Sequence, residues 1–200
     1  MRSAPYQLTC AAVLAMALCA AVPASAEKTD YAYSISELKL RFDLAAESPD
    51  VRVCLDITYR IGDESKSDGF KFVGNNKVFD LKCMDERGEP LRCEALSLRE
   101  TKIQWFFPET KNAARSFHVT FSLKAQVGRE GAQHVFHAPW AGVFRVPVEK
   151  AVFEAVLPEG VDGARLEVRP EPWQKTEDHG RIHVITEQSP LKKQDFYIKY

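Results

Sequence analysis

Two tryptophans lie beside prolines in segments without strand periodicity, and they are the residues best suited to bind a ligand. Trp140 follows Pro139, and Trp173 follows Pro172. An indole ring in a loop offers a large, rigid surface that stacks on a sugar or anchors a protein partner at little entropic cost. We therefore expect Trp140 and Trp173 to bind a ligand. The alternative is that both rings cap the ends of a packed sheet.

The histidines do not have the spacing of a metal site. His134 and His137 are three positions apart, which places them on opposite faces of a strand. His179 and His183 could share a face, but His179 falls in the turn predicted at residues 178–180, and no cysteine pair accompanies them. The sequence therefore predicts no metal ion and no other cofactor.

Signatures of catalysis are absent from the sequence as well. It contains no serine-nucleophile motif, no glycine-rich phosphate loop and no zinc-protease helix motif. Acidic residues are so frequent that pairs of carboxylates carry no information about a glycosidase-type site. We expect no catalytic residues, although an unfamiliar kind of active site stays open as an alternative.

Cys83 and Cys93 flank a predicted turn, and we expect them to form a disulfide. Residues 85–90 are typical of a turn between two strands, and pairing centred on Gly88 would place the two cysteines directly opposite each other. Such a bridge contributes about 3 kcal/mol in the chain-entropy model. Cys54 would remain a half-buried strand thiol, the alternative being a reactive or intermolecular thiol.

The first 26 residues have the layout of a cleavable secretory signal. Arg2 precedes an apolar run over residues 8–22, and we place the cleavage after Ala26. The run is too short for a comfortable membrane span, and no later segment approaches about 18 consecutive apolar residues. We therefore expect a periplasmic or secreted protein without a membrane span in the mature chain. Export also exposes the cysteines to an oxidising compartment.

The charge of the chain excludes one class of partner. The sequence has 27 lysines and arginines against 28 acidic residues, a formal net charge of -1. No basic field exists that would attract nucleic acid. The charges alternate in sign along the chain, which is typical of solvated strand faces.

Alternation with a period of two predicts an all-β protein. Residues 117–127 alternate apolar and polar positions, and residues 38–44, 51–59 and 103–107 repeat the pattern. Such strands bury one face of a sheet and expose the other. Turn signals separate them at short intervals, which favours an antiparallel, immunoglobulin-like β-sandwich.

Two prolines in residues 139–150 interrupt the strand pattern, so this segment is predicted to be a crossover or an edge. We expect a signal peptide at residues 1–26 and a β-sandwich domain at residues 27–140. Residues 141–200 would form a C-terminal β-unit that packs on the sandwich or completes it.

Five segments carry a resemblance to a known family: residues 53–59, 103–107, 116–121, 138–140 and 153–160. Their order resembles the extracytoplasmic, amino-terminal β-sandwich of a large family of uncharacterised bacterial membrane proteins. The chain departs from that family at Leu55, where an acidic residue is common, and we expect none of the membrane helices that follow in the family. The resemblance implies a β-sandwich at the cell surface and supplies no catalytic residues.

Together these features predict a non-catalytic binding or accessory protein of a bacterial cell-envelope or surface assembly, with a protein as its partner. An exposed strand edge could add a strand of that partner through main-chain hydrogen bonds. A carbohydrate-binding module that uses Trp140 and Trp173 is the first alternative. An envelope hydrolase is the second, and it would require a cleft lined by carboxylates or histidines with shifted pKa values.

Overall fold

The computed structural model describes residues 31–200, which form strands and loops without a helix. The all-β class predicted from the sequence is confirmed. The expected signal peptide and its cleavage site lie outside the described residues. Within residues 31–200, no helix long and apolar enough to cross a membrane is present. The strands are β1 (Tyr33–Leu44), β2 (Val51–Ile61), β3 (Lys66–Phe72), β4 (Val78–Asp85), β5 (Pro90–Leu91), β6 (Cys93–Ser97), β7 (Thr101–Thr110), β8 (Ala113–Leu123), β9 (Val127–Glu130), β10 (Gln133–Ala138), β11 (Ala151–Val156), β12 (Glu167–Arg169), β13 (Gln174–Asp178), β14 (Arg181–Gln188) and β15 (Phe196–Lys199).

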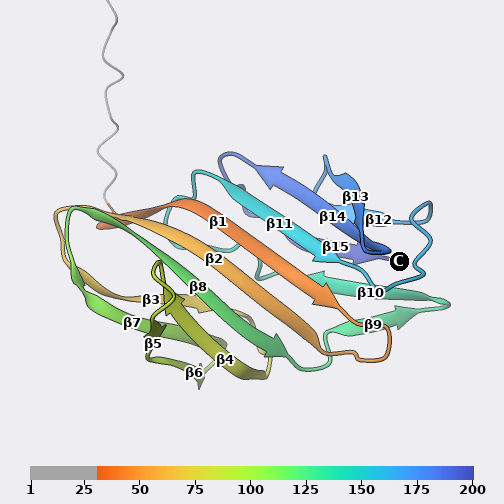
Figure 1. Ribbon diagram of the computed structural model, residues 1–200, viewed down its shortest axis with the longest axis horizontal. Coiled ribbons are helices and arrows are strands. Elements are labelled where there is room, and N and C mark those ends of the chain that lie inside the picture. Colours follow the sequence, from red (N-terminus) through yellow and green to blue (C-terminus); the bar gives the residue numbers. More distant parts are fainter. Residues whose placement is uncertain (1–30) are drawn as a thin grey trace, which may run out of the picture. The chain divides into compact units, whose positions relative to one another are not determined.

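Eight of these strands form one large sheet in the order β13, β14, β11, β1, β2, β8, β4 and β5 (Figure 1). β1 lies parallel to β11, and the other neighbours are antiparallel. In β2 the predicted alternation is present, since Val53 and Leu55 are buried whereas Arg52 and Asp56 face solvent. One face of the sheet is therefore apolar and the other is polar.

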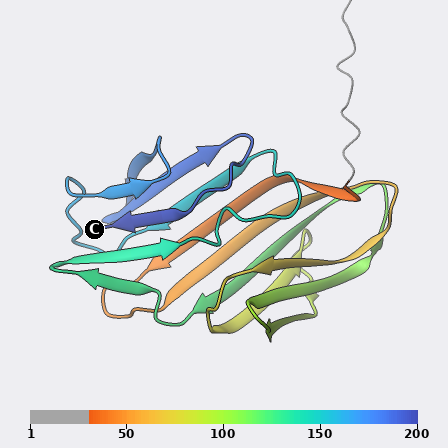
Figure 2. The same cartoon turned by 180° about the vertical axis from the view of Figure 1, so that it is seen from behind.

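Two smaller sheets pack against the apolar face of the large sheet. One has the order β12, β15, β10, β9, and the other has the order β3, β7, β6. The ring centroids of Phe42 in β1 and Phe196 in β15 are 5.2 Å apart, and those of Tyr59 in β2 and Trp105 in β7 are 6.2 Å apart. Because Phe42 and Tyr59 share the buried face, both small sheets cover the same side, which Figure 2 shows from behind. The fold is a β-sandwich whose second layer is divided in two.

Residues 141–200 contribute strands to both layers. β11, β13 and β14 belong to the large sheet, and β12 and β15 belong to the four-stranded sheet. Residues 31–200 accordingly form one compact unit. β1 lies inside the large sheet and forms main-chain hydrogen bonds with β2 on one side and β11 on the other. Without β11, one edge of β1 would be unpaired, so the C-terminal segment completes the sandwich.

The strand predicted over residues 117–127 ends earlier than expected. β8 stops at Leu123, and a turn follows in which Ala125 has a φ of 53°. The Ala125 N–H donates to the Asp50 carboxylate at 2.8 Å, which holds the turn. The chain turns here because it leaves the large sheet and enters the four-stranded sheet at β9. Residues 139–150 then form a crossover back from β10 to β11.

Candidate binding groove

A surface groove of about 1100 Å³ lies at one end of the four-stranded sheet. Its floor is a row of side chains from three neighbouring strands, in which Arg169 of β12 is opposite Tyr197 of β15, and Tyr197 is opposite His137 of β10. These side chains point outward because side chains alternate along a strand, and the next residue in β15, Ile198, is fully buried.

Charges of both signs surround this floor. The Arg169 guanidinium lies over the Tyr197 ring, with its Cζ atom 5.5 Å from the ring centroid, and it donates to the Glu167 carboxylate at 2.7 Å. His137 Nε2 lies 3.2 Å from the Asp195 carboxylate. Exposed ion pairs of this kind contribute little to folding. These groups can therefore exchange their partners for a ligand that carries charge.

The walls of the groove come from two segments. Residues 166–171 all line the groove, and because consecutive strand residues face opposite ways, the groove adjoins the main chain of β12 as well as its outward side chains. Within residues 31–200, β12 has a strand partner on one side only. Residues 193–195 form the second wall. This wall packs closely against the crossover at Gly142. A Cβ atom at residue 142 would lie 2.3 Å from the Gln194 carbonyl oxygen, so only glycine fits there.

Trp173 lies in the first wall. Its side chain is half-buried, contacts the hydrophobic core on one side and lines the groove on the other. The Thr186 hydroxyl donates to the Pro172 carbonyl oxygen at 3.0 Å and fixes the chain beside the ring. Trp173 is therefore placed where a ligand can reach it, and its role in binding stays a prediction.

Trp140 does not line a surface site, which corrects the expectation that it binds a ligand. Its side chain is only 6 % exposed. The ring packs edge-on against Phe42, with centroids 6.0 Å apart, and lies 6.4 Å from Phe121. The crossover places the indole ring between the two layers, so Trp140 is a core residue. A neighbouring proline alone does not distinguish an exposed loop from a buried crossover.

A buried lysine holds this crossover in place. Lys71 in β3 is 2 % exposed, and its Nζ atom donates to the carbonyl oxygens of Trp140 at 2.7 Å and Val143 at 2.8 Å. It also lies 3.8 Å from the centroid of the Phe144 ring. Burial lowers the pKa of Lys71 well below 10.5, while the carbonyl oxygens match the donors of the charged ammonium. Lys71 was not among the residues expected from the sequence, because its only signal is a lysine at an inward-facing strand position.

The two cysteines predicted to form a disulfide lie on strands of two different sheets, and they are not paired opposite each other as expected. Cys83 is opposite Leu91, because the turn is centred on Arg87 and each pair shifts by two positions. Cys93 belongs to β6, in the other layer. Both thiols are free in the structure. Burial, together with the neighbouring Cys93 thiol, raises the pKa of Cys83. The disulfide itself stays a prediction.

The histidines do not gather at one site, although His134 and His137 share β10. His137 faces the groove, whereas His134 stacks on the Tyr200 ring with centroids 5.4 Å apart. His183 donates to the Glu154 carboxylate at 2.8 Å, on the polar face of the large sheet. In the part of the chain that the structure describes, no three histidine, cysteine or acidic side chains come together in a way that could hold a metal ion.

Glu154 is a buried carboxylate, 6 % exposed. Burial by itself would raise its pKa, but hydrogen bonds from His183 and from Lys39, whose Nζ lies 3.0 Å away, outweigh burial and lower the pKa. The network crosses β1, β11 and β14, which are central strands of the large sheet. It therefore stabilises the sheet and contributes nothing to the groove.

Comparison with known proteins adds information about the fold. No protein-family model and no curated protein matches the chain. A solved M1 zinc metallopeptidase from Deinococcus radiodurans superimposes with a TM-score of 0.58 at 9 % sequence identity. A two-domain M1 zinc metallopeptidase bound to L-tryptophan gives a TM-score of 0.59 at 10 % identity. Each comparison covers 84 % of this chain and 42 % of the peptidase, so the chain spans less than half of those proteins. At this identity, the likeness shows a shared fold.

Proposed function

We propose that this protein is a non-catalytic binding protein, accessory to a cell-envelope or surface assembly, which holds an extended polypeptide segment of its partner in the groove. The observation that carries the proposal is that residues of β12, the edge strand of the four-stranded sheet, line the groove. A strand edge offers main-chain donors and acceptors to an added strand. Tyr197 and Trp173 add aromatic faces beside that edge.

Further arguments support a polypeptide ligand and an exported site of action. Peptidases that share this fold were solved with a Tyr-Ser-Ala substrate and with single amino acids, which are ligands of those proteins. The mixed charges of the groove suit the alternating side chains of a polypeptide. The signal predicted at residues 1–26 and the resemblance to an extracytoplasmic region favour action in the periplasm or outside the cell.

Binding accounts for the groove better than hydrolysis does. An active site is where shifted pKa values gather around a cleft. In this protein the buried groups with shifted pKa values include Lys71 and Glu154, and each has a structural partner away from the groove. The groove side chains instead form exposed ion pairs, which are suited to recognition.

A glycan is the second candidate ligand, because Trp173 and Tyr197 both present aromatic rings to the groove. Sugar rings stack on such surfaces, and the neighbouring Asp195 and Arg169 side chains supply hydrogen bonds to hydroxyl groups. The glycan hypothesis was based on Trp140 and Trp173. Because Trp140 is buried, only Trp173 is left to support it.

Mild crosslinking of the tagged mature protein in its native envelope fraction tests the proposal. Bound proteins and bound glycans are both identified, for the wild type and for Trp173→Ala. Tyr31→Ala is the matched control, since Tyr31 is a 50 % exposed aromatic residue outside the groove. We expect one stoichiometric protein that Trp173→Ala loses and Tyr31→Ala retains. Glycan without protein would favour the second candidate, and equal retention by both variants would exclude the groove.

A further inference from the structure

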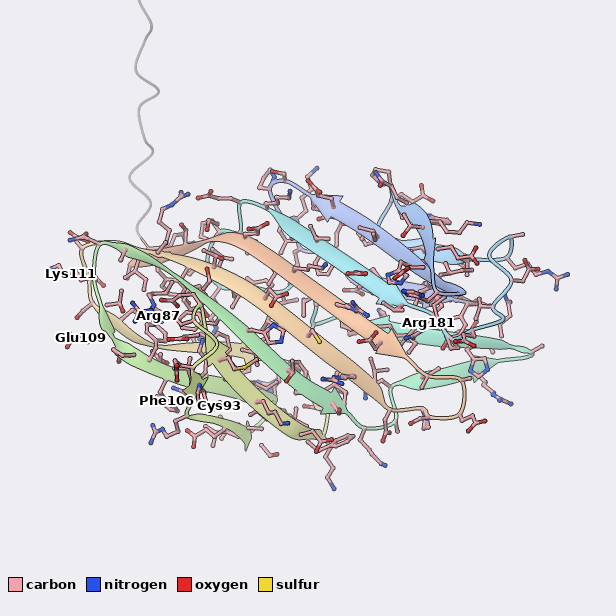
Figure 3. All side chains as sticks on the ribbon, in the orientation of Figure 1. Arg87, Cys93, Phe106, Glu109, Lys111 and Arg181 are labelled. Atoms are coloured by element: carbon pink, nitrogen blue, oxygen red, sulfur yellow. The ribbon has the colours of Figure 1, made fainter. Side chains whose placement is uncertain are left out.

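The outer face of the three-stranded sheet carries a cluster of aromatic side chains that the groove does not explain. Phe70 and Phe72 in β3 and Phe106 in β7 are half-buried and point away from the core. The rings of Phe70 and Phe72 meet edge to face, with centroids 5.6 Å apart. Figure 3 labels Phe106 on this sheet. We call these three side chains the aromatic face.

Arginines lie directly over the rings of the aromatic face. The Arg145 Cζ atom is 5.1 Å from the centroid of Phe72, and the Arg92 Cζ atom is 3.8 Å from that of Phe106. Both arginines are exposed. The arginines that form ion pairs within residues 31–200 are others, so neither Arg92 nor Arg145 has a carboxylate partner there. Each guanidinium is thus free to pair with an incoming carboxylate.

Exposed apolar side chains surround the same sheet. Leu96 is 36 % exposed, Leu98 is 68 % exposed and Val143 is 42 % exposed. These are three of the four large hydrophobic side chains that are exposed within residues 31–200. Leu96 lies in one outward row with Phe72, because both are paired with Lys102 of β7. Clustering of this kind marks an interaction surface, whereas single exposed apolar residues do not.

A pocket of about 260 Å³ adjoins the aromatic face. It lies between β3 and the crossover, and Phe72, Val143 and Arg145 all line it. Its volume suits one large apolar side chain. An apolar anchor that enters a pocket, with charged residues around it, is the usual arrangement of the residues that dominate binding energy.

We infer that this surface docks an acidic protein segment, which places one large apolar side chain in the pocket and its carboxylates against Arg92 and Arg145. Glu94 and Glu100 are exposed at the rim of the same surface. They repel carboxylates that lie elsewhere, so they select segments whose acidic residues meet the two arginines. The site is separate from the groove and does not depend on the function proposed for it.

Selection from a displayed library of random twelve-residue peptides tests this inference, with the purified mature protein as bait. Peptides that survive washing are sequenced, and their affinity is measured for the wild type and for the double variant Arg92→Glu with Arg145→Glu. The matched control is Arg129→Glu with Arg165→Glu, which changes the same charge at exposed positions elsewhere. Thermal unfolding confirms that each variant folds.

We expect the selected peptides to be rich in aspartate and glutamate around one large apolar residue. Their affinity should fall at least about tenfold in the double variant, and it should stay unchanged in the control pair and in Trp173→Ala. Peptides without acidic enrichment, or with equal affinity for the double variant, would overturn the inference. Peptides lost only in Trp173→Ala would overturn it too, while supporting the groove.

Discussion

The ammonium group of Lys71 donates a 2.7 Å hydrogen bond to the carbonyl oxygen of Trp140, and both residues are buried. This contact ties β3 of the three-stranded sheet to the crossover that leads from the four-stranded sheet to the large sheet. The crossover carries no regular strand of its own over residues 139–150. The Trp140 carbonyl oxygen also accepts from the Val143 N–H at 3.2 Å. The Val143 carbonyl oxygen accepts from Lys71 at 2.8 Å, so a side chain supplies hydrogen bonds that strand pairing does not provide here.

Replacing this lysine should destabilise the fold. Lys71→Met keeps the aliphatic stem but removes the lysine donor from the carbonyl oxygens of Trp140 and Val143, of which Trp140 keeps the Val143 N–H. This loss costs about 2–4 kcal/mol of unfolding free energy. Urea unfolding measures the change. Lys82→Met, at an exposed position of β4, is the control and should stay within about 0.5 kcal/mol of the wild type. An unchanged midpoint for Lys71→Met would show that water satisfies the carbonyl groups.

Glu154 predicts a pH-dependent contribution to stability. Its pKa is lower in the folded state than the value of about 4.3 in an unfolded chain. The unfolded state therefore binds more protons as the pH falls, and the stabilisation is complete above that value and lost below it. Glu154→Gln should cost about 1–2 kcal/mol at pH 7 and much less at pH 3.

Thermal unfolding at pH 7, 5 and 3 measures this difference. The exposed Glu187, which pairs with Lys150 at 3.3 Å, provides the control variant Glu187→Gln. An equal loss for Glu154→Gln at every pH would mean that packing, and not the charge, makes Glu154 stabilising.

The strands were predictable from the sequence, and their assembly was not. Alternation in residues 51–59 identifies β2 and its buried face, because the pattern is local and strand geometry has a period of two. The groove could not be predicted from such local patterns, because pairing across three strands brings Arg169, Tyr197 and His137 together. Trp173 was proposed from its residue type and the neighbouring proline, and its role in binding is still a prediction. Trp140 was misplaced because the pattern does not show which loops are covered by a second layer.

Gly69 should tolerate no side chain. A Cβ atom there would lie 2.3 Å from Cε2 of Trp105, whose ring is fully buried. Gly69→Ala should therefore destabilise the protein by about 1–3 kcal/mol through overpacking. Gly128→Ala is the matched control, since its nearest neighbour would be the Val135 carbonyl oxygen at 3.9 Å. Denaturant unfolding that finds equal stability for the two variants would contradict this packing.

The predicted disulfide is testable by counting thiols. If Cys83 and Cys93 are bridged in the exported protein, a maleimide reagent should label one thiol, Cys54, in the denatured, unreduced chain and three after reduction. The bridge would join the two layers and contribute about 3 kcal/mol. Mass spectrometry of the labelled chain provides the count. Three labelled thiols before reduction would exclude the bridge.

Site-specific photocrosslinking tests the central proposal most directly. A photoreactive amino acid is placed at position 171, in the wall of the groove, or at position 111, an exposed position outside it. Each protein is illuminated in its native envelope fraction, and the adducts are identified by mass spectrometry. Binding of a partner segment in the groove predicts one protein adduct from position 171 and none from position 111. The same adducts from both positions, or adducts from position 111 alone, would contradict it.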